Sequence, residues 1–249
     1  EQQWGQGGPV ALAGQASLGA RCRHEPGRSA TLGEHAPGDI KPESVDPQGD
    51  GQLSVATYNV ENLSAADEQG KFDRLAEGIA NNLAAPDIVA LEEAQDNNGA
   101  TDDGEVNADG TLKRFTDAIA DAGGPRYQWR QIDPRNNADG GEPGGNIRVA
   151  FLFNPDRVSF VVGEGGDATT PVRAEQGKNG PKLSVSPGRI EPDGQMWRET
   201  RKPLAGEFTF QGRTVFVVAN HFSSKGGDQP LHGRFQPPER SSEQQRIAQ

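Results

Sequence analysis

The sequence is poor in the residues that build hydrophobic cores. Leu, Ile, Val and Phe together supply 46 of its 249 residues, a share below the ~20% that, combined with high net charge, is typical of disordered chains. The shortage is uneven, because residues 1–50 hold 6 of the 46 whereas residues 204–222 hold 8. We therefore expect an irregular lead-in or linker over residues 1–50 and an ordered domain over residues 51–249.

Long apolar runs and paired cysteines are also missing. No run approaches the ~20 residues that span a bilayer, and none has the apolar core of a signal peptide, so the sequence predicts no membrane span. The one cysteine excludes an internal disulfide and any zinc site built from several cysteines. The 33 Gly and 18 Pro residues show no three-residue period, which excludes collagen and predicts long loops.

Acidic and basic residues are spread unevenly along the chain, whose formal net charge is -11. Residues 87–125 hold ten acidic and two basic side chains, whereas residues 197–249 hold eight basic and five acidic ones. An acidic chain disfavours non-specific binding to nucleic acid, but an acidic patch beside a basic one suits a metal ion facing a phosphate. Ordinary solvated surface explains the same pattern, so charge alone does not decide the function.

Hydrophobic periodicity predicts a strand, a helix and a second strand in the first part of the ordered region. Residues 53–60 are enriched in β-branched and aromatic side chains, which is typical of a strand. Apolar residues recur at helical spacing over residues 72–83 and a proline follows them, so we expect a helix there. Residues 87–93 predict a buried strand, and the three segments together predict a βαβ unit.

The later part of the chain is expected to alternate regular elements with long loops. Helical spacing followed by a glycine predicts a second helix over residues 112–123. Residues 147–153 predict a strand, and residues 206–210 and 214–222 predict the two strands of a β-hairpin. Residues 241–244 resemble a capping box and predict the start of a further helix.

Three predicted strands end in polar side chains that suit a catalytic site. Successive side chains of a strand point to opposite faces, so every second residue forms a row on one face. Asn59, Glu93 and His221 each end such a row, and Glu92 faces the opposite way from Glu93. Sites in layered α/β proteins are commonly built at strand carboxyl ends. Oxygen donors without thiolates favour Mg²⁺, Ca²⁺ or Mn²⁺, held partly by water and a phosphate substrate. A histidine beside them can exchange a proton or donate a hydrogen bond to a phosphoryl oxygen.

Each of these residues also has an ordinary structural use. A glutamate or histidine at a strand end is commonly a solvated residue, and Asn59 is suited to capping a turn. Lys225 offers positive charge to a phosphate, but its Ser-Lys-Gly-Gly run lacks the spacing of a phosphate-binding loop. Residues 102–109 form an acidic loop whose order departs from the EF-hand calcium pattern. These residues alone leave the function undecided.

Several short motifs together resemble a known superfamily. Residues 56–62 read Ala-Thr-Tyr-Asn-Val-Glu-Asn, residues 87–93 read Asp-Ile-Val-Ala-Leu-Glu-Glu, and residues 218–222 read Val-Ala-Asn-His-Phe. In this order they resemble the opening motifs of the endonuclease/exonuclease/phosphatase superfamily. The resemblance implies its DNase I-like α/β (α+β) fold, a four-layer sandwich of two mixed β-sheets with flanking helices. Residues 132–148, 201–204 and 221–228 further resemble the large bacterial extracellular nucleases.

The resemblance implies a divalent-metal-dependent phosphodiesterase that hydrolyses DNA or RNA, with Mg²⁺, or Mn²⁺ or Ca²⁺, as its cofactor. By the same resemblance Glu93 is the metal ligand, Asn59 orients the metal and the phosphate, and His221 bonds the scissile phosphate or assists the leaving group. The residues implied to contact substrate phosphates are Arg148, Lys225, Arg201 and Lys202. Water attacks the phosphodiester and the 3′ oxygen leaves, with positioning and charge neutralisation supplying most of the catalysis. We expect a secreted monomer.

Two motifs that complete the superfamily site do not occur in the sequence. They are a Gly-Asp-x-Asn strand end and a Ser-Asp-His motif. We therefore expect residues 51–249 to be the N-terminal two thirds of a catalytic domain, and the chain to be a fragment that is inactive or nearly so. The alternatives are a phosphomonoesterase or phospholipid diesterase of the same superfamily, and a non-catalytic nucleic-acid-binding module.

Overall fold

A computed structural model describes residues 42–224 and 243–249. Its elements in chain order are β1 (Val55–Leu63), α1 (Gln69–Glu77), the π-helical turn η1 (Gly78–Asn82), β2 (Ile88–Ala94), α2 (Asp109–Asp121), β3 (Gln128–Arg130), β4 (Arg148–Phe153), β5 (Ser159–Phe160), β6 (Ala174–Gly177), β7 (Gly180–Leu183), β8 (Gly188–Arg189), the 3-10 turn η2 (Gln195–Trp197), β9 (Leu204–Phe210), β10 (Arg213–Ala219) and α3 (Glu243–Ala248). In this described part, no helix is long and apolar enough to cross a membrane.

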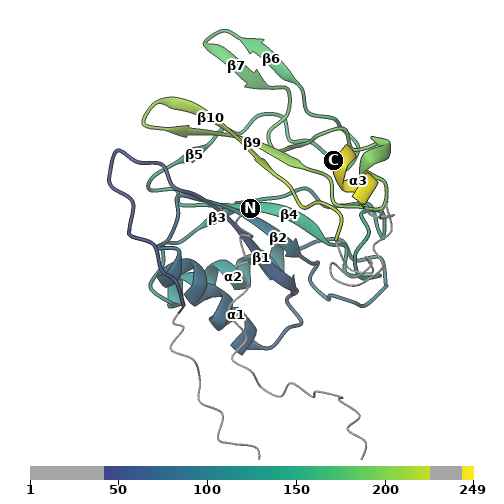
Figure 1. Ribbon diagram of the computed structural model, residues 1–249, viewed down its shortest axis with the longest axis horizontal. Coiled ribbons are helices and arrows are strands. Elements are labelled where there is room, and N and C mark those ends of the chain that lie inside the picture. The colour runs from purple at the N-terminus through teal and green to yellow at the C-terminus, as the bar shows by residue number, and fades with distance from the viewer. Residues whose placement is uncertain (1–41, 225–242) are drawn as a thin grey trace, which may run out of the picture.

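The first sheet contains the expected βαβ unit. Its strand order is β1-β2-β4-β3, with β1 parallel to β2 and the other neighbours antiparallel. α1 connects the two parallel strands, and η1 continues its path to Asn82, which agrees with the helix predicted over residues 72–83. Figure 1 shows α1 and α2 lying together on one side of this sheet. Parallel pairing matters for function, because it brings the carboxyl ends of β1 and β2 to the same edge.

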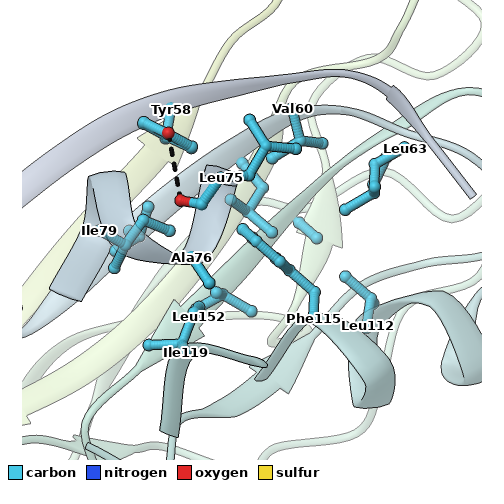
Figure 2. Packing of buried hydrophobic residues seen from close by; sticks show 14 of the residues in the cluster. Tyr58, Val60, Leu63, Leu75, Ala76, Ile79, Leu112, Phe115, Ile119 and Leu152 are labelled. Atoms are coloured by element: carbon cyan, nitrogen blue, oxygen red, sulfur yellow. Dashed lines mark hydrogen bonds between the residues drawn. The ribbon is translucent and has the colours of Figure 1, made fainter. Parts of the chain in front are cut away.

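The helix-facing side of the first sheet is packed with fully buried side chains. Phe72, Leu75 and Ile79 point from α1 and η1 toward Phe115 of α2, and all four have no exposed surface. Figure 2 shows this cluster together with Tyr58, whose hydroxyl donates a 3.2 Å hydrogen bond to the carbonyl of Leu75. Each such apolar side chain contributes about 1.5–3 kcal/mol by leaving water. The same packing fixes β1 against α1 and therefore fixes where β1 ends.

The second sheet has the strand order β10-β9-β5, with β8 also paired to β9. All of its pairs are antiparallel, and β6 and β7 form a third, two-stranded antiparallel sheet. Among the described residues, only the first sheet is therefore mixed. The predicted hairpin is confirmed, since Gln211 and Gly212 join β9 to β10 with φ of 48° and 76°, as a two-residue turn with both central φ positive requires. Among the described residues, α1 and α2 cover the first sheet only, so three layers are seen (Figure 1).

Aromatic rings join the two sheets. The Phe208 ring of β9 lies 5.4 Å from the Phe151 ring and 5.9 Å from the Phe153 ring of β4, measured between centroids. The Phe160 ring of β5 lies 5.1 Å from Phe208. Gly206 is required at its position, because a Cβ there would lie 2.9 Å from the rings of both Phe151 and Phe208. This contact places the end of β10 opposite the ends of β1 and β2.

Candidate active site

The end of β2 and the segment directly after β10 bring Glu93 and His221 together; β10 ends at Ala219, short of the strand predicted over residues 214–222. Glu93 Oε1 lies 3.5 Å from His221 Nε2, and both side chains are partly buried. On the other side of the imidazole, Arg201 Nε donates to His221 Nδ1 at 3.2 Å. Arg201 Nη2 also donates to the carbonyl of Phe222 at 2.9 Å, which holds the guanidinium in place. A carboxylate, an imidazole and a buried guanidinium therefore form one connected row between the two sheets.

A β-bulge decides where the Glu93 carboxylate points. The pairing of β2 with β4 breaks between Leu91 and Ala94, and Glu93 has a φ of 63°. Strict alternation predicts that Glu93 faces the helices together with Leu91, and this prediction is wrong. The bulge instead turns the carboxylate toward His221 of the second sheet. A non-glycine residue in this conformation costs about 1–3 kcal/mol; nine other non-glycine residues among those described also have a positive φ, several of them in turns.

Glu92 and Thr57 form a pair that the sequence analysis missed. Thr57 Oγ1 donates a 2.5 Å hydrogen bond to Glu92 Oε1 across the β1–β2 pairing. Burial raises the pKa of Glu92, the bond from Thr57 opposes this, and the charge of Glu93 raises the pKa further. The Glu-Glu pair at the strand end was the only signal in the sequence. Two carboxyl groups thus lie close to one another at this edge of the first sheet.

Asn59 lies beside this edge and also caps a turn. In the register of the first sheet Asn59 is opposite Glu92, on the side of β1 that faces the second sheet. Its Oδ1 accepts a 2.8 Å hydrogen bond from the backbone N–H of Glu61, where the chain turns with φ of 56° at Glu61 and 55° at Asn62. Asn59 therefore does cap a turn. This hydrogen bond leaves the second lone pair of Oδ1 for another partner.

The surroundings of His221 hold its imidazole neutral. Burial lowers the pKa of His221 to about 4, the charge of Arg201 lowers it as well, and Glu93 only partly opposes them. Because Arg201 Nε–H donates to Nδ1, we assign the imidazole proton to Nε2. Burial also lowers the pKa of Arg201, against the opposing charge of Glu93. At neutral pH His221 is thus an uncharged donor whose Nε2–H faces the carboxylate.

Residues 56–247 match the model of the endonuclease/exonuclease/phosphatase family. The chain belongs to this family. Membership confirms the resemblance on which the expected DNase I-like fold was based, and it places the chain in a hydrolytic superfamily of nucleases and phosphatases. The match spans the described residues from β1 to α3 and therefore includes Glu93, His221 and Arg201.

A comparison with solved structures also found a similar protein. A crystal structure of D. rerio TDP2, humanised by 14 mutations, is similar at 16% sequence identity with a TM-score of 0.33. The similarity covers 70% of this chain and 49% of that chain, so this chain spans about half the length of that protein. No curated protein matches the chain.

The implied phosphate contact Arg148 is a buried residue in this member of the endonuclease/exonuclease/phosphatase family. Its side chain is 1% exposed, and Nη1 lies 2.7 Å from Asp133 Oδ1 and 3.0 Å from Gln131 Oε1. Nε and Nη2 both donate to the carbonyl of Asn146. Burial lowers the pKa of Arg148 to about 10, and the charge of Asp133 opposes this. The guanidinium therefore links the start of β4 to the chain after β3 and does not face Glu93.

Replacing Arg148 with methionine is expected to lower the free energy of unfolding by about 1.5–3 kcal/mol, because hydrogen bonds made by a charged group are lost. Methionine keeps an unbranched stem in the buried space. Urea unfolding of the variant and the wild type measures the difference. A variant with unchanged stability but weaker nucleic-acid binding would contradict this structural role and would support the phosphate contact that the resemblance implies.

Lys202 and Lys225 differ in what the structure says of them. Lys202 Nζ lies 2.9 Å from Asp139 Oδ1 and donates to the carbonyl of Thr200 at 2.9 Å. Asp139 is also paired with Arg189 at 3.0 Å, and all three charged side chains are buried. Lys202 is thus held away from the Glu93–His221 pair. Lys225 lies outside the described residues, so its role in binding phosphate stays a prediction.

The side-chain oxygens at this edge of the sheet suit a hard cation that takes only some of its ligands from the protein. Over residues 42–224 and 243–249, no group of three or more His, Cys, Asp or Glu residues is placed to hold a metal ion. Glu93 and Asn59 offer a carboxylate and an amide oxygen, with Glu92 close by. Mg²⁺ commonly takes one or two carboxylates and completes its shell with water and substrate phosphate. The residues present therefore suit Mg²⁺ or Mn²⁺ bound together with a phosphate.

The acidic loop before α2 uses its carboxylates on its own backbone. Asp103 Oδ1 accepts from the N–H of Glu105 at 3.0 Å, and Glu105 Oε1 accepts from the N–H of Asn107 at 2.6 Å. Asp103 Oδ2 accepts from the side chain of Asn98 at 2.9 Å. These bonds lower the pKa of Asp103. They give the loop a structural explanation that needs no calcium ion.

Proposed function

We propose that this chain carries the metal-binding side of a divalent-metal-dependent phosphodiesterase that hydrolyses nucleic acid. The row formed by Glu93, His221 and Arg201 is the observation that supports this proposal. It offers a carboxylate for a cation next to an uncharged hydrogen-bond donor, in a member of a hydrolytic family. That combination suits a phosphodiester, because the cation and the donor reach different oxygens of one phosphate.

Each residue of the row has a separate task in this proposal. Glu93 and Asn59 hold the divalent cation, which when bound polarises a phosphoryl oxygen and offsets its negative charge. His221 donates its Nε2–H to a second oxygen of the same phosphate. Arg201 is a positioning residue, because it fixes the imidazole through Nδ1 and so keeps the proton on Nε2.

The proposed reaction consumes one water molecule for each bond that is broken. Water adds to phosphorus while the bond from phosphorus to the 3′ oxygen breaks, which leaves a 5′-phosphate and a 3′-hydroxyl. Negative charge on the phosphoryl oxygens is the main obstacle, so positioned positive charge and hydrogen-bond donors provide most of the rate enhancement. Export from the cell and a monomeric state are also proposed, on the resemblance to bacterial extracellular nucleases alone.

The test compares substrates and metals. The chain and the full-length natural protein are each incubated with plasmid DNA, RNA, inositol phosphates and sphingomyelin, in Mg²⁺, in Mn²⁺ and in EDTA. Cleavage of DNA or RNA that EDTA stops is the expected result for the full-length protein. Hydrolysis of inositol phosphates or sphingomyelin alone would overturn the proposal in favour of the other superfamily activities. Salt-sensitive nucleic-acid binding without any cleavage would support a non-catalytic module.

A further inference from the structure

A hollow lined by residues of the segments 135–138 and 192–202 has no role in the function proposed above. It has a volume of about 440 Å³, within the range of sites that hold small ligands. Arg135, Trp197, Arg198 and Lys202 line it. Residues 197–202 connect the hollow to the candidate active site, since this segment begins at Trp197 and includes Arg201, the partner of His221. The hollow and the active site therefore flank the same short piece of chain.

An aromatic contact strengthens this connection. The Trp197 ring stacks on the Phe222 ring, with centroids 6.2 Å apart and an interplanar angle of 24°. Phe222 directly follows His221, and its carbonyl accepts a hydrogen bond from Arg201. The aromatic pair thus links the wall of the hollow to the residue that follows His221.

Positive charge is in excess beneath the hollow. Lys202 and Arg189 both pair with Asp139, at 2.9 Å and 3.0 Å, and all three side chains are buried. Two positive groups against one carboxylate leave one unit of positive charge in a poorly hydrated place. Such charge acts more strongly on an approaching anion than the same charge on the surface. The floor of the hollow therefore favours an anionic ligand.

The two arginines at the rim are not firmly held by their neighbours. Arg135 Nη2 is 3.9 Å from Asp193, and Arg198 Nε is 3.7 Å from Glu199. The arginine side chains are 64% and 76% exposed, and ion pairs so long and so exposed contribute little. Their guanidinium groups can turn to an incoming phosphate with a small loss. Arginine suits that task because its planar fork matches two phosphate oxygens.

We propose that this hollow is a subsite for the nucleotide next to the scissile phosphodiester. Arg135 and Arg198 contact its phosphate, and the buried Arg189–Asp139–Lys202 group supplies the background charge. The proposal rests on the proposed function, because it takes the ligand to be a nucleic-acid strand. It adds a place where the strand is held outside the bond that breaks.

The experiment measures binding of a fluorescein-labelled single-stranded oligothymidylate by anisotropy, in EDTA and over a series of salt concentrations. The R135A/R198A double variant is compared with R126A/R213A, which removes the same charge. Arg126 and Arg213 are both exposed; Arg126 lies just before β3, and Arg213 is the first residue of β10. The subsite variant is expected to bind roughly tenfold more weakly at low salt. Its salt slope should fall by about 0.7, since the two arginines contact one phosphate and each phosphate neutralised on a single strand contributes ~0.7.

Trp197→Phe provides a second control, because it removes a buried N–H and keeps an aromatic ring against Phe222. It should leave both the affinity and the salt slope unchanged, since the indole nitrogen has no accessible surface that a ligand could reach. The proposal is overturned if the wild type does not bind the oligonucleotide, or if both double variants bind alike. Because EDTA prevents metal-dependent cleavage, a loss of binding in R135A/R198A upholds the subsite even where the cleavage assays fail. Cleavage with no difference between the double variants would overturn the subsite alone.

Discussion

Glu93→Gln in the full-length natural protein is expected to reduce metal-dependent cleavage of nucleic acid by at least about a thousandfold. A cation that neutralises developing phosphate charge is worth several kcal/mol, and each 1.36 kcal/mol is about a factor of ten in rate. Glutamine keeps the size of the side chain and its place beside His221, but it is a neutral and much weaker ligand for Mg²⁺. Initial rates of plasmid cleavage at saturating Mg²⁺ measure the loss.

The matched control is Glu92→Gln. Glu92 accepts a hydrogen bond from Thr57, and the amide oxygen of glutamine can accept the same bond. We expect this variant to lose less than about tenfold in rate, the lower end of what supporting residues at metal sites contribute. The assignment of Glu93 as the ligand fails if the two variants lose activity equally. Thermal unfolding of both variants shows whether either loss comes from misfolding.

Phe208→Ala is expected to cost about 3–5 kcal/mol of the free energy of unfolding, the range for removing a buried aromatic ring. Phe208 has no exposed surface and contacts the rings of Phe151, Phe153 and Phe160. Since domains are stable by only about 5–15 kcal/mol, the variant should be close to unfolding at room temperature. Urea unfolding followed by circular dichroism gives the value, with the slope against urea checked for change.

Phe216→Ala is the control for this measurement. Phe216 lies on β10, the strand next to Phe208, but it is 43% exposed. We expect its replacement to change the free energy of unfolding by less than about 1 kcal/mol. Equal losses in the two variants would mean that the two sheets do not depend on the Phe208 contact. The position of His221 opposite Glu93 would then need another explanation.

The elements that periodicity predicts are those in which local sequence and burial agree. Residues 72–83 repeat apolar side chains at helical spacing, and the same side chains form the helix-facing core. Gln211 and Gly212 are suited to a two-residue turn, and the hairpin forms around them. The short strands β6, β7 and β8 lie within residues 161–203, where no strand was predicted. β6 and β7 pair with each other as a local hairpin, whereas β8 pairs with the later strand β9 and so depends on a contact more distant in sequence.

The candidate site was predicted in its residues but not in its geometry. Alternation assumes a regular strand, and nothing in residues 87–93 signals the bulge that turns Glu93 to the second sheet. Arg148 follows a glycine-rich loop, which suggests exposure, but its partner Asp133 comes 15 residues earlier and removes it from the surface. Arg201 and Lys202 are neighbours with different partners, His221 and Asp139. Such details follow from tertiary contacts that one sequence does not encode locally.

The backbone conformation at Glu93 sets two selective pressures against each other. Glycine adopts a φ near 63° without strain, so a glycine at this position would make the chain more stable in that respect. It would also remove the carboxylate. A lineage that no longer needed hydrolysis would gain stability by losing this side chain, whereas one that depends on it must keep a locally unfavourable residue. Under the proposed function, we therefore expect the residue at this position in related chains to separate enzymes from descendants that have kept only the fold.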